Sequence, residues 1–188
     1  MIGAAEVAGF ERCITGGGVA VFPTDTLYGI GCAVGDQAAR ERLYELKGRP
    51  RDKPSAVMFF SIEAAEPVLA EVGGRTRAAL EALLPGPLLA VLPGSKGIRI
   101  PRVEGALASV RTPVLQTSAN LTGGPDPRRL ADVLDELRAG ADLVLDGGEL
   151  PGVPSTVVDL SRYENEGRWE ILREGAVPAE AVRIALRS

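Results

Sequence analysis

Strand-length apolar runs that alternate with helix-like segments constrain the fold of this chain more than any other feature. Several of these runs are nearly continuous in Val, Leu and Ile, as in strands that are buried on both faces. The short gap between residues 92 and 98 predicts a hairpin, so part of the sheet should be antiparallel. The alternation predicts an α/β fold in which helices surround a twisted mixed sheet. The expected strands cover residues 19–22, 56–60, 88–92, 98–100, 114–116, 143–145, 156–160 and 169–172.

Two segments carry strong helical signals. Residues 36–47 have apolar side chains at helical spacing, with Asp36 as a suitable N-cap and Gly48 as a stop. Residues 126–139 repeat this pattern, with Asp126 at the cap position. We therefore expect a helix in each segment, and weaker helices at residues 62–72, 75–84, 103–109 and 178–186.

The composition excludes several classes of function. The chain has no histidine, so an imidazole base, a Ser-His-Asp triad and a histidine-based zinc site are all excluded. Its two cysteines, Cys13 and Cys32, are too few for a structural zinc site and are interpreted as small core residues. The net charge of −4 argues against a protein that coats nucleic acid, although a local basic groove stays compatible with it.

Length and hydropathy predict a single domain over residues 1–188. No apolar run approaches the roughly 18 residues of a membrane span, and the first residues lack the pattern of a secretory signal. We therefore expect a cytoplasmic protein without a membrane partner.

The first polar segment of interest is Thr24-Asp25-Thr26, which follows an apolar run. It would place two hydroxyls and a carboxylate at the end of a strand, where α/β folds often bind ligands. An ordinary turn, in which these side chains bond to local backbone groups, explains the segment equally well.

The second segment carries four cations within seven residues: Lys47, Arg49, Arg51 and Lys53. Arg can hold phosphate oxygens through two donors, whereas Lys acts as a point charge. We expect Lys47 and Arg49 to face a polyanion such as a nucleotide, and Arg51 to lie on the surface. A solvated charged loop is the alternative.

Four later segments are further candidates. Ser118 and Asn120 lie in a polar loop after an apolar strand and could hold a nucleotide or an amino acid. Arg99 lies inside an apolar strand and needs an anionic partner, either a carboxylate of the fold or a ligand. Ser155 and Arg173, each next to a strand, give weaker signals. The chain has neither the G-x-x-x-x-G-K-[ST] phosphate loop nor the G-x-G-x-x-G dinucleotide motif.

Taken in order, seven segments of this chain resemble those of the YrdC family of threonylcarbamoyl-AMP synthases. Each segment is common on its own, but seven in this order are specific, and they extend from about residue 17 to residue 175. We expect the single-domain form, without the extra C-terminal domain of longer members. The segments are Pro-Thr-Asp-Thr-Leu-Tyr-Gly (23–29), Lys-Gly-Arg-Pro (47–50), Pro-Gly-Pro-Leu (85–88), Ser-Ala-Asn (118–120), Asp-Gly-Gly (146–148), Ser-Thr-Val-Val-Asp (155–159) and Leu-Arg (172–173).

The resemblance implies a twisted α/β sheet around a concave, positively charged cavity. It also implies an enzyme, a nucleotidyltransferase, that makes threonylcarbamoyl-AMP and pyrophosphate from L-threonine, bicarbonate and ATP. Mg²⁺ would arrive with ATP, and no metal would be held by the protein alone. The product would supply a separate tRNA-modifying transferase complex that acts on adenosine 37 of tRNA. Direct contact with tRNA or double-stranded RNA is a further expectation.

The resemblance also implies roles for individual residues. Lys47 and Arg49 would be the catalytic cations and, with Lys53, would face the triphosphate. Thr26 and Arg99 match positions that hold threonine, with Arg99 pairing with its carboxylate. Because positioning and charge dominate such a phosphoryl-group displacement, we expect no protein side chain to act as a strong general base. Ser118, Asn120 and Arg173 complete the ATP-binding set, and Ser155 completes the threonine-binding set.

The chain departs from the family pattern at three places on the threonine side. Only residues 93–96 remain of a usually longer connection, Met58 occupies a position where some members have histidine, and Arg102-Val103 replaces a His-Pro pair. Two alternatives therefore accompany the synthase hypothesis. One is a YrdC-like RNA-binding module without synthase activity, and the other is a related carbamoyl-adenylate enzyme with a different substrate.

Overall fold

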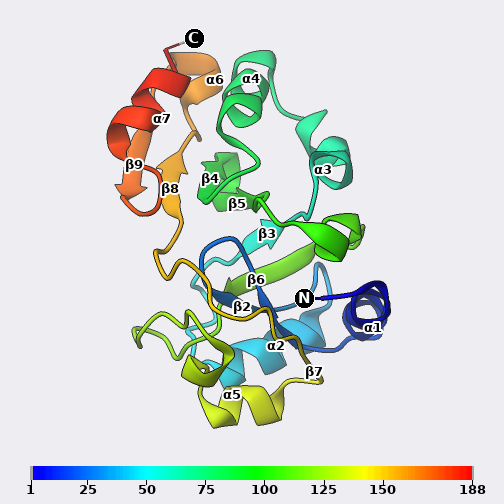
Figure 1. Cartoon of the computed structure of the whole chain (residues 1–188). Helices are drawn as coiled ribbons and strands as arrows, with labels where there is room; N and C mark the ends of the chain where they lie inside the picture. The colour runs from blue at the N-terminus through cyan, green and yellow to red at the C-terminus, as the bar shows by residue number, and fades with distance from the viewer. Residues whose placement is uncertain (1, 188) are drawn as a thin grey trace.

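The structure is a computed structural model and describes residues 2–187. Within these residues the strands form one nine-stranded mixed sheet of order β7-β1-β2-β6-β3-β5-β4-β8-β9, with helices packed around it (Figure 1). This confirms the expected α/β fold. The strands are β1 (Ala20–Pro23), β2 (Tyr28–Ala33), β3 (Ala56–Met58), β4 (Leu88–Leu92), β5 (Lys96–Arg99), β6 (Val114–Ser118), β7 (Leu143–Val144), β8 (Thr156–Asp159) and β9 (Glu170–Arg173).

Seven α-helices and three short 3₁₀ helices connect the described strands. The α-helices are α1 (Ala4–Thr15), α2 (Gln37–Leu46), α3 (Ile62–Leu69), α4 (Gly74–Leu83), α5 (Asp135–Gly140), α6 (Tyr163–Glu166) and α7 (Ala179–Ala185). The 3₁₀ helices cover Pro93–Ser95, Gly105–Ser109 and Leu130–Asp132. None of the helices in residues 2–187 is both long and apolar enough to cross a membrane.

The sheet is mixed because hairpins and crossovers both contribute to it. β4 and β5 form the expected antiparallel hairpin, with Leu89 opposite Arg99. β1–β2, β2–β6, β3–β6 and β8–β9 are also antiparallel, whereas β1–β7, β3–β5 and β4–β8 are parallel. The central strands β6, β3 and β5 therefore join two halves of the sheet that carry different helices.

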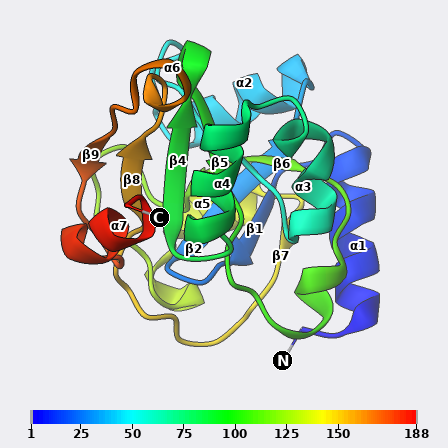
Figure 2. The same ribbon diagram turned by 90° about the horizontal axis from the view of Figure 1, so that it is seen from above.

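Each half of the sheet has its own apolar packing. Helices α3, α4 and α7 pack on β4, β5 and β8 in one buried cluster, and Figure 2 shows α4 lying over β4 and β5. Helix α1 packs against β1 around the rings of Phe10, Phe22 and Phe60, whose centroids lie 5.1 to 6.0 Å apart. Helices α2 and α5 cover the opposite face of β1 and β2. The face of β4, β5 and β8 that α3 and α4 leave uncovered is available for a site.

Strand β2 was not expected from the sequence, which we interpreted as a turn from Thr24 onward. Glycines are unfavourable in strands, and β2 contains Gly29 and Gly31. The structure shows why a small residue is needed at Gly31. A Cβ atom there would lie 2.5 Å from the Val114 side chain and 2.7 Å from the carbonyl oxygen of Leu115 on β6. Close packing of β2 against β6 therefore overrides the local propensity.

The helix expected over residues 126–139 is wrong for most of its length. Only α5, Asp135–Gly140, is α-helical there. Asp126 does not cap a helix. Its carboxylate instead accepts a hydrogen bond from Asn120 Nδ2 at 3.2 Å. The carbonyl of Pro127 accepts a bond from the backbone N–H of Tyr28 at 2.9 Å. The start of this segment is therefore irregular and is held against the beginning of β2 by this bond.

The other helix expectations agree with the structure. Helix α2 begins at Asp36, whose carboxylate accepts a bond from the Ala39 N–H at 2.9 Å. The four weaker expectations correspond to α3, α4, the 3₁₀ helix at Gly105–Ser109, and α7. Helices α1 and α6 were missed, although Val7, Phe10 and Ile14 are buried at helical spacing. Cys13 and Cys32 are both free thiols.

Candidate active site

A cavity of about 370 Å³ lies beside the carboxyl end of β6 and the amino end of β2, and against the uncovered face of β4, β5 and β8. All nine residues that the sequence predicts for the site line this one cavity, although they come from six separate segments of the chain. They are Thr26, Lys47, Arg49, Lys53, Arg99, Ser118, Asn120, Ser155 and Arg173.

The cavity carries more positive than negative charge on its wall. Of the described residues that line it, five are cationic and one, Asp126, is a carboxylate. A concave wall with this balance favours an anionic ligand. Arg51, in contrast, has a side chain that is 73% exposed and lies 3.8 Å from Glu45, so it is a surface residue as expected.

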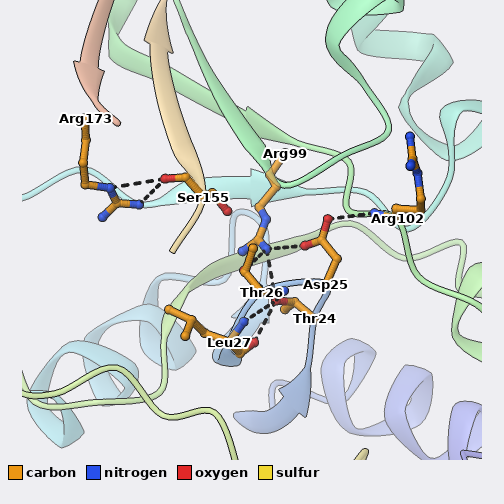
Figure 3. A network of polar contacts seen from close by, with 8 residues as sticks. All are labelled: Thr24, Asp25, Thr26, Leu27, Arg99, Arg102, Ser155 and Arg173. Carbon is orange, nitrogen blue, oxygen red and sulfur yellow. Dashed lines mark hydrogen bonds and ion pairs between the residues drawn. The ribbon is translucent and has the colours of Figure 1, made fainter. Parts of the chain in front are cut away.

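The Thr24-Asp25-Thr26 turn closes around Arg99, which extends from the end of β5 (Figure 3). Nη2 of Arg99 donates to Thr24 Oγ1 at 3.0 Å, to Asp25 Oδ1 at 2.6 Å and to Thr26 Oγ1 at 2.6 Å. The side chains of Arg99 and Asp25 are each 7% exposed, so this is a buried ion pair. The other oxygen of Asp25 accepts a bond from the Arg102 N–H at 2.9 Å. The anionic partner that Arg99 requires is therefore Asp25.

Lys47 is the most deeply buried cation of the site, with 1% of the residue exposed. Its Nζ donates to the backbone carbonyl of Ser118, to the carbonyl of Asn120 at 2.5 Å and to Asn120 Oδ1 at 3.4 Å. Burial, followed by the charges of Arg49 and Lys53, lowers the pKa of Lys47 to about 7, and only Asp126 opposes this. Lys47 therefore fixes the loop after β6 and contributes a charge that the fold compensates weakly.

The cationic loop that contains Arg49 and Lys53 is held by Tyr44 on α2. The Tyr44 hydroxyl donates to the Lys53 carbonyl at 3.0 Å and lies 2.9 Å from Ser55 Oγ. The guanidinium of Arg49 stacks over the Tyr44 ring at 5.6 Å, and its Nη2 donates to the Pro54 carbonyl at 2.6 Å. Arg49 is thus preorganised at the cavity wall.

Ser118 and Asn120 form a hydrogen-bonded loop. Ser118 Oγ donates to Asn120 Oδ1 at 2.7 Å, and Asn120 Nδ2 donates to the Gly124 carbonyl at 2.9 Å. Across the cavity, Arg173 donates through Nη2 to the Ser155 carbonyl at 2.7 Å (Figure 3). These bonds orient both pairs within the fold.

Four buried side-chain atoms have no hydrogen-bond partner among the described residues, and all four belong to residues that line the cavity: Arg49 Nε, Arg99 Nε, Gln116 Oε1 and Ser155 Oγ. Buried polar groups in folded proteins are nearly always paired, so unpaired ones gathered around one cavity point to ligand or water. Gln116 was not assigned to the site from the sequence. The signal that could have found it is a long amide side chain within an otherwise apolar strand.

Two departures from the family pattern lie away from the cavity. Met58 is fully buried in the apolar cluster with Phe22 and Phe60, and neither Met58 nor any residue of 93–96 is among the described residues that line the cavity. No cluster of three or more Cys, Asp or Glu side chains that could hold a metal occurs in residues 2–187.

Comparison with known proteins assigns this chain to a family. A family model named Sua5/YciO/YrdC, described as "Telomere recombination", matches residues 12–175. The chain belongs to this family. The resemblance inferred from the seven sequence segments is thereby confirmed.

Curated members of the Sua5/YciO/YrdC family include enzymes. The chain is 33% identical over 192 residues to a threonylcarbamoyl-AMP synthase of Pyrococcus abyssi, covering 93% of this chain and 54% of that protein. It is 30% identical over 166 residues to a threonylcarbamoyl-AMP synthase of Nitrosococcus oceani, covering 79% of this chain and 89% of that protein. The chain thus spans about half the length of the Pyrococcus relative and of a Bacillus subtilis relative.

Solved structures of the family have the same fold. P. abyssi Sua5 complexed with L-threonine superposes with a TM-score of 0.85 at 30% identity, covering 98% of this chain and 58% of that one. E. coli YciO superposes with a TM-score of 0.77 at 24% identity, covering 95% of this chain and 92% of that one. The second likeness supports the fold alone.

Proposed function

We propose that this chain is a nucleotidyltransferase that forms L-threonylcarbamoyl-AMP from L-threonine, bicarbonate and ATP, with release of pyrophosphate. The observation that carries the proposal is the convergence of all nine predicted site residues on one cavity. The names of the curated relatives and the threonine complex of P. abyssi Sua5 support it.

The proposed reaction has two steps, and the cationic lining of the cavity suits both. The amine of threonine adds to the carbon of bicarbonate and water leaves, which gives a carbamate. A carbamate oxygen then attacks the α-phosphorus of ATP, the bond between the α-phosphorus and the bridging oxygen breaks, and pyrophosphate leaves. Positioning and charge stabilisation dominate such an in-line displacement. No protein side chain is required as a strong base, and Asp25 is already engaged by Arg99.

The nucleotide side of the cavity would be formed by the weakly compensated cations. Lys47, Arg49 and Lys53 would face the triphosphate and stabilise charge on the leaving pyrophosphate. Ser118, Asn120 and Arg173 would complete this side, with Lys47 holding the Ser118–Asn120 loop in place through its Nζ bonds. The division is supported by the repulsion of Lys47 by Arg49 and Lys53 on this side, in contrast to Arg99, which is paired with Asp25.

The amino-acid side would be formed by Thr26, Arg99 and Ser155. All three hydrogen bonds from Arg99 to the turn are donated by Nη2, and its Nε has no partner among the described residues. The threonine carboxylate would accept a bond from this nitrogen, and the unpaired Ser155 Oγ would lie on the same side. Asp25 would then set the orientation of Arg99 without touching the substrate.

Mg²⁺ would enter with ATP and be held mostly by phosphate oxygens and water. The product would pass to a separate transferase complex that modifies adenosine 37 of tRNA, in the cytoplasm. The chain would act as a single domain, in keeping with one sheet that uses strands from Ala20 to Arg173. Contact with tRNA stays a prediction, and the pI of about 5.1 weighs against RNA binding as the main activity.

A pyrophosphate-release assay tests the proposal. Purified protein is incubated with ATP, Mg²⁺, bicarbonate and each amino acid in turn. Release that requires both bicarbonate and L-threonine is the expected result. Release with another amino acid would identify the related carbamoyl-adenylate enzyme, and no release together with salt-sensitive tRNA binding would identify the RNA-binding module.

A further inference from the structure

Gln116 is the one residue with an unpaired buried atom to which neither the sequence nor the proposed function assigns a role. The residue is 5% exposed, and its Oε1 lacks a partner among the described residues. A buried amide oxygen without a partner costs about 1–3 kcal/mol. A fold that keeps such a group beside a cavity is expected to satisfy it with something that enters the cavity.

Gln116 lies on β6 between a residue of the apolar core and a residue that lines the cavity. On β6 it stands opposite Gly31 of β2 and Ala56 of β3. Side chains two residues apart on a strand share a face. Val114, two residues before it, packs in the apolar cluster with α1, and Ser118, two residues after it, lines the cavity. Gln116 is therefore a polar group at the apolar end of the site.

The immediate surroundings of the Gln116 amide are defined by Gly29 on β2. A Cβ atom at Gly29 would lie 3.1 Å from Gln116 Oε1, 3.4 Å from the Phe22 ring and 3.4 Å from the methyl group of Thr24. These separations are tight, so β2 has no room for a side chain at Gly29, and the Gln116 amide lies directly against the β2 backbone. Thr24 also accepts a bond from Arg99 at 3.0 Å. Gln116 and Thr24 thus both adjoin Gly29, which places the Gln116 amide near the guanidinium proposed to hold the amino-acid carboxylate.

We propose that Gln116 determines the amino-acid specificity of the site by hydrogen bonding to the β-hydroxyl of L-threonine. A hydroxyl both donates and accepts, so it pairs with the amide whichever of its two atoms faces the cavity. This inference rests on the proposed function and extends it by naming the group that reads the substrate side chain.

The physical consequence is discrimination against amino acids of the same shape that lack the hydroxyl. Valine replaces the hydroxyl of threonine by a methyl group and would leave the buried amide unpaired. An apolar pocket discriminates against a substrate that lacks one methyl group by only about 10–200-fold. A site that hydrogen-bonds a substrate hydroxyl discriminates far more strongly against an analogue that lacks the hydroxyl. Serine, which lacks only the methyl group, is therefore expected to bind better than valine.

The test compares Gln116→Met with wild-type protein. Met has a similar length but cannot replace the amide hydrogen bonds. Calorimetry measures the affinities for L-threonine, L-serine, L-valine and ATP separately. Leu115→Met is the matched control, because it introduces the same residue at the next position of β6, on the face that packs against α2 and α5. Thermal unfolding of each variant checks that the fold is retained.

We expect Gln116→Met to weaken threonine binding by about 5–150-fold, the equivalent of one buried hydrogen-bond partner lost. Affinities for valine and ATP should stay within threefold of wild type, and Leu115→Met should keep the wild-type preference. If Gln116→Met does not fold, Gln116→Asn, which shortens the side chain by one methylene, should show the same loss of preference for threonine over valine.

Two contrary results have different meanings. A folded Gln116 variant that keeps the wild-type ratio of threonine to valine affinity overturns the role of Gln116 and leaves the proposed function standing. A wild-type protein that binds ATP but no L-threonine overturns the proposed function, and the role of Gln116 with it.

Discussion

Binding of ATP should raise the protonation of Lys47, because the free protein disfavours its charge. The side chain is buried, Arg49 and Lys53 repel it, and the pKa of Lys47 is lowered from the ordinary value of 10.5 to about 7. At pH 8 a group with a pKa of 7 is about 9% protonated. The free site therefore contains Lys47 mostly as a neutral amine at this pH.

A triphosphate on the proposed nucleotide side supplies the missing counter-charge. An opposite charge within about 4–6 Å favours the protonated amine, and a rise of two pKa units corresponds to about 2.7 kcal/mol. With a pKa of about 9 in the complex, Lys47 would be about 91% protonated at pH 8. Binding should therefore take up about 0.8 proton, and ATP affinity should fall about sixfold from pH 7.5 to pH 8.5 by linkage.

Calorimetry at pH 8 in two buffers with different ionisation enthalpies measures this uptake directly. The difference in observed binding enthalpy, divided by the difference in ionisation enthalpy, gives the number of protons bound. Lys47→Arg is the control, because a guanidinium stays charged throughout this pH range. Equal proton uptake by wild type and Lys47→Arg would refute the reasoning, since the protons would then come from another group.

Two further substitutions test how the fold supports the site. Asp25→Asn leaves the buried Arg99 guanidinium without its counter-charge, so chemical denaturation should show a loss of about 3–5 kcal/mol of stability. Unchanged stability would mean that the pair is not buried as described. Asn120→Ala removes bonds from one side chain to Gly124 and Asp126, each worth about 1 kcal/mol. Amide hydrogen exchange of the loop after Ser118 should then quicken by about tenfold or more, and unchanged exchange would show that the loop is held by other contacts.

The lining of the cavity could be predicted from the sequence, but the contacts within it could not. Hydroxyls, cations and an amide loop at strand ends, together with the family resemblance, identified the nine lining residues before their positions were known. The partners of Lys47 are backbone carbonyls 71 and 73 residues away, which have no signature in side-chain chemistry. The sequence also left the partner of Arg99 open, and only tertiary packing selects Asp25 for it.

Two of the errors in the predicted fold, at β2 and after Asp126, have a common cause, because tertiary contacts outweigh local propensity at both places. Strand β2 contains two glycines that local rules assign to a turn, yet the side chain of Val114 on β6 requires Gly31. The segment after Asp126 has the composition of a helix start, yet its backbone bonds to Tyr28. Both places border the cavity, so the local rules failed where the site is built.

The electrostatics of the cavity suggest how its two proposed sides would select different ligands. Arg99 is already neutralised by Asp25, so its side offers directed donors with little net charge. Arg49 and Lys53 repel Lys47 and lower its pKa, with only Asp126 opposing them, so the nucleotide side holds cations with little counter-charge. Salt screens net charge more strongly than short hydrogen bonds in a buried pocket. Under the proposed function, nucleotide binding would therefore depend on ionic strength, whereas amino-acid selection would depend on the geometry of Arg99, Ser155 and Gln116.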